Sequence, residues 1–231
     1  MQQLPLGVRL HDRAVFASFL PARNAEALAH ARAAAAGRAG LTWLAGPPGA
    51  GKTHLLQAVC AAAPAARRCG YVPLRELSAL GVEVLEGLPQ LECLALDDVD
   101  AVAGRSEWER ALFTLVREFA ERGGTLLLAA GVPPARCPWV LPDLGSRCAA
   151  ADVLHLHALN ESEQQVALRL RARLRGLELS VHTARWLQRR FPRDMRTLYQ
   201  LLDTLDEAAL TAQRRLTIPF IRAVLARRMP R

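Results

Sequence analysis

A glycine-rich stretch around the only lysine of the chain carries the clearest chemical signal. The spacing of Gly46, Gly51, Lys52 and Thr53 is that of a phosphate-binding loop, which follows a strand and opens a helix. Backbone N–H groups of such a loop surround a phosphate, and the helix start adds partial positive charge. Lys52 would reach the terminal phosphates of ADP or ATP, and Thr53 would ligate Mg²⁺. The predicted nucleotide-binding residues of the loop are Gly46, Pro47, Pro48, Gly49, Ala50, Gly51, Lys52, Thr53 and His54.

A second stretch, LECLALDDVD over 91–100, ends an apolar run with two adjacent carboxylates. An apolar strand that ends in acids, placed after a phosphate-binding loop, is typical of a magnesium site. Asp97 would hold Mg²⁺ directly or through water, together with Thr53. Asp98 would polarise the attacking water, although it is shorter than the glutamate usual at that position.

The surrounding pattern predicts an α/β fold. Apolar runs over 41–45, 91–97 and 125–130 read as buried strands, and residues 106–122 read as a helix with Ser106 as N-cap and Glu109 three residues on. This alternation predicts a mostly parallel sheet covered by helices on both faces.

Residues 159–231 predict a smaller, all-helical domain of four short helices. Their expected starts are Asn160, Ser180, Pro192 and Thr217, which are capping or first-turn residue types. Two apolar stripes at helical spacing are expected to face its core. They are Val166, Leu170, Leu174 and Leu177 in the first helix, and Met195, Leu198, Leu202 and Leu205 in the third.

Several segments together resemble AAA+ proteins of the DnaA type. AVFASFLPARNAEAL over 14–28 resembles the segment that leads into the nucleotide pocket of that family, LPDLGSRCAAADVLHL over 141–156 its box VII region, and FPRDMRTLYQLLDTLDEAAL over 191–210 its sensor 2 helix. The tail over 205–225 is closer still to the Hda branch. The resemblance implies a P-loop sheet sandwiched between helices (11–158) and an α-helical lid (159–231), with no room after residue 231 for a DNA-reading domain.

The resemblance also implies roles for single residues. Arg147 matches the arginine finger, which would enter a neighbouring protein's site and stabilise charge on the γ-phosphate. The alternative is a structural arginine paired with Asp143 or Asp152. Arg193 matches the sensor 2 arginine that contacts the nucleotide. For that role Arg196 is an alternative contact, and a solvated surface arginine is the other reading. Gly131 stands where the family has a polar sensor 1 residue.

The first residues resemble the sliding-clamp-binding peptide of Hda-like proteins, roughly QLxLP. Gln3, Leu4, Pro5 and Leu6 match it, and Gly7 replaces the final proline. Pro5 biases Leu4 towards an extended conformation, which lowers the ordering cost on binding. Residues 1–10 are therefore expected to be a flexible clamp-binding peptide. The alternative is that Leu4 and Leu6 pack onto the chain's own domain.

The function implied by this resemblance is negative regulation of replication initiation. The protein would bind ADP or ATP with Mg²⁺, grip the DNA-loaded β sliding clamp of DNA polymerase III, and stimulate hydrolysis of ATP bound to DnaA. Its own ATPase would be weak or absent. A homodimer, mainly indirect DNA contact and a cytoplasmic location are expected. Alternatives are an AAA+ loader or transposition-type ATPase that binds DNA through lid arginines, and a self-assembling AAA+ ATPase.

Composition leaves the DNA question open. The net charge is +8 and the pI near 10.2, which suits a polyanion partner, yet 29 of the 30 basic residues are arginine, a bias that GC-rich codons alone could produce. Five cysteines without a CxxC pair favour reduced thiols over a disulfide frame or zinc site. The sequence has neither a secretory signal pattern nor an apolar run long enough for a membrane span.

Overall fold

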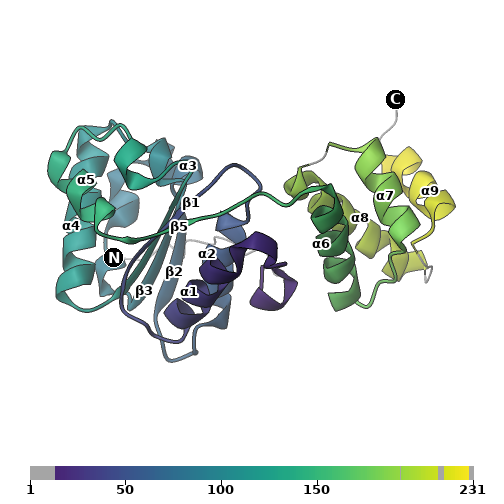
Figure 1. The fold of residues 1–231 in the computed structure, drawn as a ribbon, viewed down its shortest axis with the longest axis horizontal. Coiled ribbons are helices and arrows are strands. Elements are labelled where there is room, and N and C mark those ends of the chain that lie inside the picture. The colour runs from purple at the N-terminus through teal and green to yellow at the C-terminus, as the bar shows by residue number, and fades with distance from the viewer. Residues whose placement is uncertain (1–13, 193, 213–215, 229–231) are drawn as a thin grey trace. The chain divides into compact units, whose positions relative to one another are not determined.

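The computed structural model describes residues 14–192, 194–212 and 216–228, and it divides the chain into two compact units. The first unit ends at Ala158 and holds the sheet, and the second begins at Leu159 and is helical. Figure 1 shows the sheet with helices on both of its faces in the first unit, and a bundle of helices in the second.

The sheet of the first unit is five-stranded and parallel, with strand order β2-β3-β4-β1-β5. Parallel strands place all their carboxyl ends at one edge, where ligands of open α/β sheets bind. The three strands predicted from apolar runs are confirmed as β1, β3 and β4. The strands are β1 (Gly40–Ala45), β2 (Cys69–Pro73), β3 (Cys93–Asp97), β4 (Thr125–Ala130) and β5 (Asp152–His155).

Helices cover both faces of this sheet because strand residues alternate between two apolar clusters. One cluster joins Trp43, Leu94 and Leu126 to α4 and α5, and the other joins residues such as Leu44 and Ala95 to α1 and α2. The predicted sandwich is therefore confirmed. The helices of this unit are α1 (Ala25–Ala35), α2 (Lys52–Ala62), α3 (Leu74–Leu77), α4 (Ser106–Glu121) and α5 (Pro142–Ala149). Short 3-10 turns lie at Phe16–Ser18, Ala22–Asn24, Ser78–Leu80, Val82–Leu85, Leu88–Gln90, Val99–Ala101 and Pro134–Arg136.

The predicted cap of α4 is wrong in its details. Ser106 is the first helical residue, Arg105 is the N-cap, and no side chain caps the helix. The Glu109 carboxylate is instead fully buried and accepts hydrogen bonds from the backbone N–H groups of Gly104, Val140 and Leu141 at 2.7–3.2 Å. Glu109 therefore fixes the loop that leads into α5, a distant contact that a capping pattern does not reveal.

Replacing Glu109 with alanine is expected to lower the free energy of unfolding by about 2–4 kcal/mol, because three backbone donors lose a charged acceptor. Chemical denaturation measures this loss. Glu121→Ala is the matched control on the same helix, since Glu121 makes only an exposed ion pair with Arg117 and should cost less than about 1 kcal/mol. Equal effects of the two substitutions would contradict the role given to Glu109.

The second unit consists of α6 (Glu161–Leu174), α7 (Val181–Arg190), α8 (Met195–Ala212) and α9 (Ile218–Arg228). Three predicted caps are confirmed, since the Asn160, Ser180 and Thr217 side chains each accept a backbone N–H from the first turn. Helix α8 begins at Met195 rather than at Pro192, and the Asp194 carboxylate accepts from its first turn.

The core face predicted for α6 is wrong, whereas that of α8 is confirmed. Val166 and Leu174 are about half exposed, and the buried residues of α6 are Ala167, Leu168, Arg171 and Ala172. Small alanines allow neighbouring helices to approach closely. On α8 the predicted stripe Met195, Leu198, Leu202 and Leu205 is buried.

Charges also lie inside this helical unit. Arg175, the C-cap residue of α6, hydrogen-bonds Asp203 of α8, and the Arg171 guanidinium lies 3.7 Å from the same carboxylate and 4.2 Å above the Tyr199 ring. Both arginine side chains are only 10% exposed. These two arginines therefore hold α6 to α8. Across the described ranges, no helix has the length and apolar character required to cross a membrane.

Candidate functional site

The glycine loop follows β1 and opens α2, as its sequence predicts. Gly49 and Gly51 both adopt positive φ, and a side chain on Gly51 would also meet the Phe19 ring at 2.7 Å. Glycine is therefore required at position 51 for backbone and contact alike. Lys52 and Thr53 are the first two residues of α2, where backbone N–H groups have no partner within the helix. The partial positive charge at the start of α2 and the backbone N–H donors of the loop therefore favour binding of an anion such as phosphate at this position.

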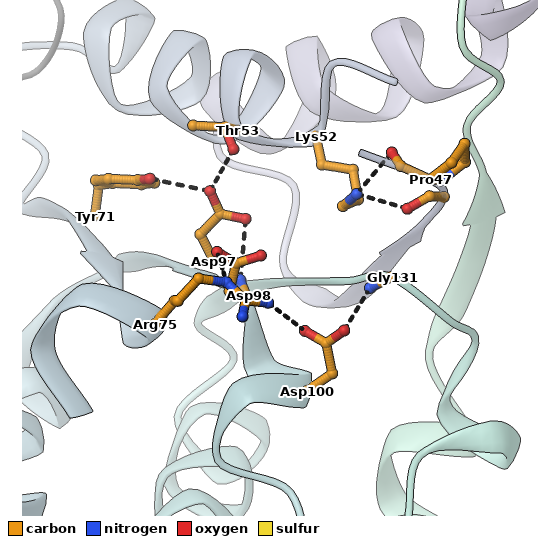
Figure 2. A network of polar contacts seen from close by, with 10 residues as sticks. Pro47, Lys52, Thr53, Tyr71, Arg75, Asp97, Asp98, Asp100 and Gly131 are labelled. Atoms are coloured by element: carbon orange, nitrogen blue, oxygen red, sulfur yellow. Dashed lines mark hydrogen bonds and ion pairs between the residues drawn. The ribbon is translucent and has the colours of Figure 1, made fainter. Parts of the chain in front are cut away.

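Lys52 is buried and bridges the loop. Its Nζ donates to the carbonyl oxygens of Gly46 at 2.6 Å and Pro47 at 3.1 Å (Figure 2). Burial lowers the pKa of Lys52, and the carboxylates of Asp97 and Asp98 oppose that shift. A buried ammonium held only by carbonyl oxygens is a strong donor for an anion in this loop.

Asp97 at the end of β3 is the polar centre of the site. Its carboxylate accepts hydrogen bonds from the Thr53 hydroxyl at 2.6 Å, the Tyr71 hydroxyl at 3.0 Å and the Asp98 backbone N–H at 3.0 Å (Figure 2). Burial raises the pKa of this carboxyl above its ordinary value, with the hydrogen bond from Thr53 opposing the shift. A nearby cation would therefore stabilise the ionised form.

The donor set fits a magnesium ion of the kind that phosphates share. Thr53 and Asp97 offer one hydroxyl and one carboxylate on adjoining elements. Over the residues that the structure covers, no group of three or more His, Cys, Asp and Glu could hold a metal by itself. Mg²⁺ typically takes one or two protein ligands and completes its shell with phosphate oxygens and water. The site therefore fits Mg²⁺ as the companion of a bound phosphate.

Asp98, the predicted water-polarising acid, is engaged by an arginine. Its backbone has φ of 54°, a strained value for a residue other than glycine. The Arg75 Nε donates to its carboxylate at 3.0 Å (Figure 2). This hydrogen bond raises the pKa of Arg75 above its ordinary value. In this conformation the Asp98 carboxylate is occupied by the hydrogen bond from Arg75, which competes with an attacking water for the same oxygen.

The Asp100 carboxylate lies against Gly131, the residue that follows β4. The Gly131 N–H donates to Asp100 Oδ2 at 3.0 Å, and a Cβ on Gly131 would meet the same oxygen at 3.0 Å. Figure 2 shows Asp100 between Gly131 and Arg75, whose Nη2 lies 4.0 Å from the other carboxylate oxygen. The backbone that follows β4 is therefore connected to the acidic stretch through the Asp100 carboxylate, because Gly131 has no side chain that could make this contact.

Residues 15–19 pack against the start of α2. His54 Nε2 lies 2.9 Å from the Val15 carbonyl oxygen and 3.2 Å from the Ser18 hydroxyl, and the His54 ring meets the Phe19 ring edge to face. His54 therefore anchors the chain segment that precedes α1 beside the loop.

Arg147 lies near the amino ends of the strands, whereas the glycine loop follows the carboxyl end of β1. It belongs to the last turn of α5 and lines a mainly apolar cavity of about 440 Å³ together with Gly40, Leu41 and Leu126, at the amino ends of β1 and β4. At about 3.3 Å per strand residue, the six-residue strand β1 separates this edge from the loop by roughly 15–20 Å. Arg147 is too far from this loop to act on a phosphate bound there.

Neither predicted acidic partner holds Arg147. Its guanidinium lies over the Phe113 ring, 5.0 Å from the centroid, and the residue is exposed. Asp152 pairs instead with Arg38 at 3.2 Å and lies 3.9 Å from His30. Within the described part of the chain, no ion pair reaches Arg147.

Some predicted residues lie outside the described ones. These are Arg193, the predicted sensor 2 contact, and the clamp-binding residues Gln3, Leu4, Pro5 and Leu6. Conversely, Tyr71, Arg75 and Asp100 belong to the polar network but were not predicted as site residues. Of these three residues, only Asp100 could have been found from the sequence, because it lies in the same acidic stretch as Asp97 and Asp98.

Residues 161–225 match a family model described as "Hda, lid domain". The whole chain also has the fold of domain III of the replication initiation protein DnaA from Thermotoga maritima, with a TM-score of 0.76, 20% identity, and 95% and 98% of the two chains covered. The helical unit is therefore similar to the Hda lid domain, and the chain shares its fold with domain III of DnaA. The confirmed resemblance rests on the lid match for the family and on the structural match for the fold.

Two further solved structures share the fold of this chain. AMPPCP-bound DnaA from Aquifex aeolicus matches with a TM-score of 0.70 and 19% identity over 84% of this chain and 65% of that one. The RuvB Holliday junction branch migration motor of Thermotoga maritima matches with a TM-score of 0.64 and 18% identity over 94% of this chain and 72% of that one. The fold is therefore common to an initiator and a motor, and function must be argued from the site.

Proposed function

We propose that this Hda-like protein is a negative regulator of replication initiation that stimulates hydrolysis of ATP bound to DnaA. Arg147 would enter the DnaA nucleotide site and stabilise the charge that develops on the γ-phosphate. The observation that carries the proposal is the position of Arg147. It is exposed, unpaired with any acid in the described residues, and at the sheet edge remote from its own loop.

We also propose that the chain binds ADP or ATP with Mg²⁺ at residues 46–54, with Thr53 and Asp97 serving the metal. The positive φ of Gly49 and Gly51, the buried ammonium of Lys52 and the Thr53–Asp97 pair support this assignment. The AMPPCP-bound state of the structurally similar Aquifex aeolicus DnaA supports it further. When bound, Mg²⁺ would neutralise phosphate charge, and Lys52 would exchange loop carbonyls for phosphate oxygens. Arg193 or Arg196 would contact the nucleotide from the lid.

The chain's own hydrolysis is proposed to be weak. Asp98, the residue proposed to polarise the attacking water, is paired with Arg75. Gly131 offers no side chain to position that water. Both features suit a protein that holds a nucleotide and acts on a partner. Recruitment would come from Gln3 to Leu6 binding the DNA-loaded clamp, so DNA contact would be mainly indirect. A homodimer could mask Arg147 in a resting state.

A phosphate-release assay tests the proposal. ATP-loaded DnaA, clamp on DNA and this protein are combined, and each component is omitted in turn. The proposal expects fast release only when all three are present. Release that needs no DnaA would instead favour a self-assembling ATPase. Binding to bare DNA with a steep salt dependence would favour a DNA-binding loader. Against the loader, two of the lid arginines that would bind DNA, Arg171 and Arg175, are engaged with Asp203 inside the lid.

Replacing Arg75 with alanine is expected to raise the chain's own slow ATP hydrolysis, because the Asp98 carboxylate loses the donor that occupies it and becomes free to accept a hydrogen bond from water. General bases contribute about 10²–10⁴-fold, so a rise of up to about 10²-fold is expected. Steady-state phosphate release measures it. Arg105→Ala is the control, since Arg105 pairs with Glu107 away from the site. Unchanged hydrolysis in Arg75→Ala would show that this pair does not limit turnover.

Replacing Gln3, Leu4 and Leu6 together with alanine is expected to abolish capture of the protein by immobilised clamp, because the peptide loses its amide and both apolar anchors. The melting temperature should stay within about 1 °C of the parent, since a peptide reserved for the clamp would contribute little to the stability of its own domain. A lower melting temperature with clamp binding retained would instead mean that these leucines pack onto their own domain.

A further inference from the structure

Three cysteine side chains lie together at the ends of α2, β2 and β3 that are remote from the candidate site. Cys60 lies in the last turn of α2, Cys69 opens β2 and Cys93 opens β3. Cys69 and Cys93 are register partners in the parallel ladder, and the Cys69 Sγ lies 3.2 Å from the Cys60 Sγ. All are free thiols. A disulfide requires about 2.05 Å between sulfurs, so the Cys60 and Cys69 sulfurs need to approach by only about 1 Å.

This cluster is suited to sulfur chemistry rather than to metal binding. Among the described residues, no arrangement of three or more His, Cys, Asp and Glu could hold a metal ion. Cys60 and Cys69 are both partly exposed, so a small oxidant in solvent can reach them. They belong to different elements, a helix and a strand, and a bond between them would join two elements of the site.

The surroundings favour ionisation of one sulfur of the cluster. Contacts of the Cys69 sulfur with the sulfurs of Cys60 and Cys93, together with the charge of Arg67, lower the pKa of Cys69 below its ordinary value against the opposing effect of burial. The same pairing raises the pKa of Cys60, and burial adds to it. Arg67 is itself fixed by hydrogen bonds to the Ala34 carbonyl oxygen at 2.5 Å and the Thr125 hydroxyl at 2.7 Å. A thiolate beside a protonated thiol is the arrangement of a nucleophile and its resolving group.

We propose that Cys69 and Cys60 form a reversible disulfide when the protein meets hydrogen peroxide. The Cys69 thiolate attacks one peroxide oxygen and breaks the O–O bond, which gives a sulfenic acid on Cys69 and hydroxide. The Cys60 sulfur then attacks the Cys69 sulfur, the S–O bond breaks, and the oxygen leaves as water with the Cys60 proton. In total two thiols lose two electrons, and one peroxide, with the two thiol protons, becomes two molecules of water.

The bond would connect parts of the polar network described above. Helix α2 begins with Lys52 and Thr53, and β2 carries Tyr71 and leads into Arg75. A covalent bond between Cys60 and Cys69 would hold the far end of α2 to the first residue of β2. Formation of the disulfide does not depend on the proposed nucleotide chemistry, so its test stands alone.

The test uses the full chain with its reduced thiols. The protein is treated with hydrogen peroxide, its remaining thiols are alkylated, and its peptides are mapped by mass spectrometry. A Cys60–Cys69 cross-linked peptide is expected, lost again after treatment with a dithiol reductant. Cys137 and Cys148, buried in the other core cluster, are internal controls and should be oxidised at least about tenfold more slowly.

Variants separate the two steps of the reaction. Cys60→Ser should stop oxidation at the sulfenic acid, so that Cys69 is trapped by a 1,3-diketone reagent. Cys148→Ser should cross-link as the parent does. The proposal is overturned if Cys69 goes on to a sulfinic acid without cross-linking in the parent chain, if it pairs with Cys93 instead, or if Cys60 and Cys69 react no faster than Cys137.

Discussion

Replacing Arg147 with alanine is expected to slow hydrolysis of DnaA-bound ATP in the complete assembly by about 10³-fold or more, the loss seen when a trans-acting arginine finger is removed. The guanidinium is exposed, stacked on Phe113 and remote from its own loop, so its removal should leave nucleotide and clamp binding intact. Single-turnover phosphate release from ATP-loaded DnaA measures the effect.

Arg136→Ala is the matched control for this substitution. Arg136 is an exposed arginine of the same unit, in the short 3-10 turn that precedes α5. Its removal changes net charge equally but should leave the stimulated rate within about twofold, since screened surface charges act weakly at a distance. Full stimulation by Arg147→Ala would mean that the finger lies elsewhere. An equal loss in both variants would indicate a general effect of charge.

Replacing Lys52 with alanine is expected to weaken binding of ADP and ATP by about 10²–10⁴-fold. Hydrogen bonds to charged groups are each worth about 1.5–3 kcal/mol, and Lys52 would make two of them to phosphates. Titration with a fluorescent nucleotide, in Mg²⁺, gives the affinity. Unchanged affinity would overturn the assignment of residues 46–54.

The folded state of this variant needs its own control. Lys52 also donates to the Gly46 and Pro47 carbonyl oxygens, so its loss could loosen the loop. Lys52→Arg retains the charge and donors on a longer, planar group that fits a point-charge site poorly. It should also weaken binding, with a melting temperature close to the parent. Parent-like affinity in Lys52→Arg would mean that any positive charge at position 52 is sufficient for nucleotide binding.

Local patterns in the sequence predicted the loop and the acidic strand end, because their spacing is fixed by short-range geometry. The strand β2 was not predicted. It is five residues long, contains Gly70 and Pro73, and shows no alternation. Tyr71 and Arg75 were therefore missed with it, since their contacts to Asp97 and Asp98 cross 26 and 23 residues of chain.

Errors elsewhere came from a local rule that a distant contact overrode. The apolar stripe on α6 suggested a core face, but the closely packed face uses alanines and a paired arginine. Glu109 fits a capping pattern, yet its carboxylate binds the backbone of residues 140 and 141 instead. Such contacts depend on the packed unit, so a single sequence carries little signal for them.

The most direct measurement is the position of Arg147 in a complex with DnaA and clamp on DNA, trapped with ADP and a metal fluoride in the DnaA site. Cryo-electron microscopy of that assembly would give the distance from the guanidinium to the fluoride group that mimics the transferred phosphoryl. The account predicts hydrogen-bonding distance, about 2.7–3.2 Å. An Arg147 side chain directed into solvent, with another arginine at the phosphoryl mimic, would contradict it.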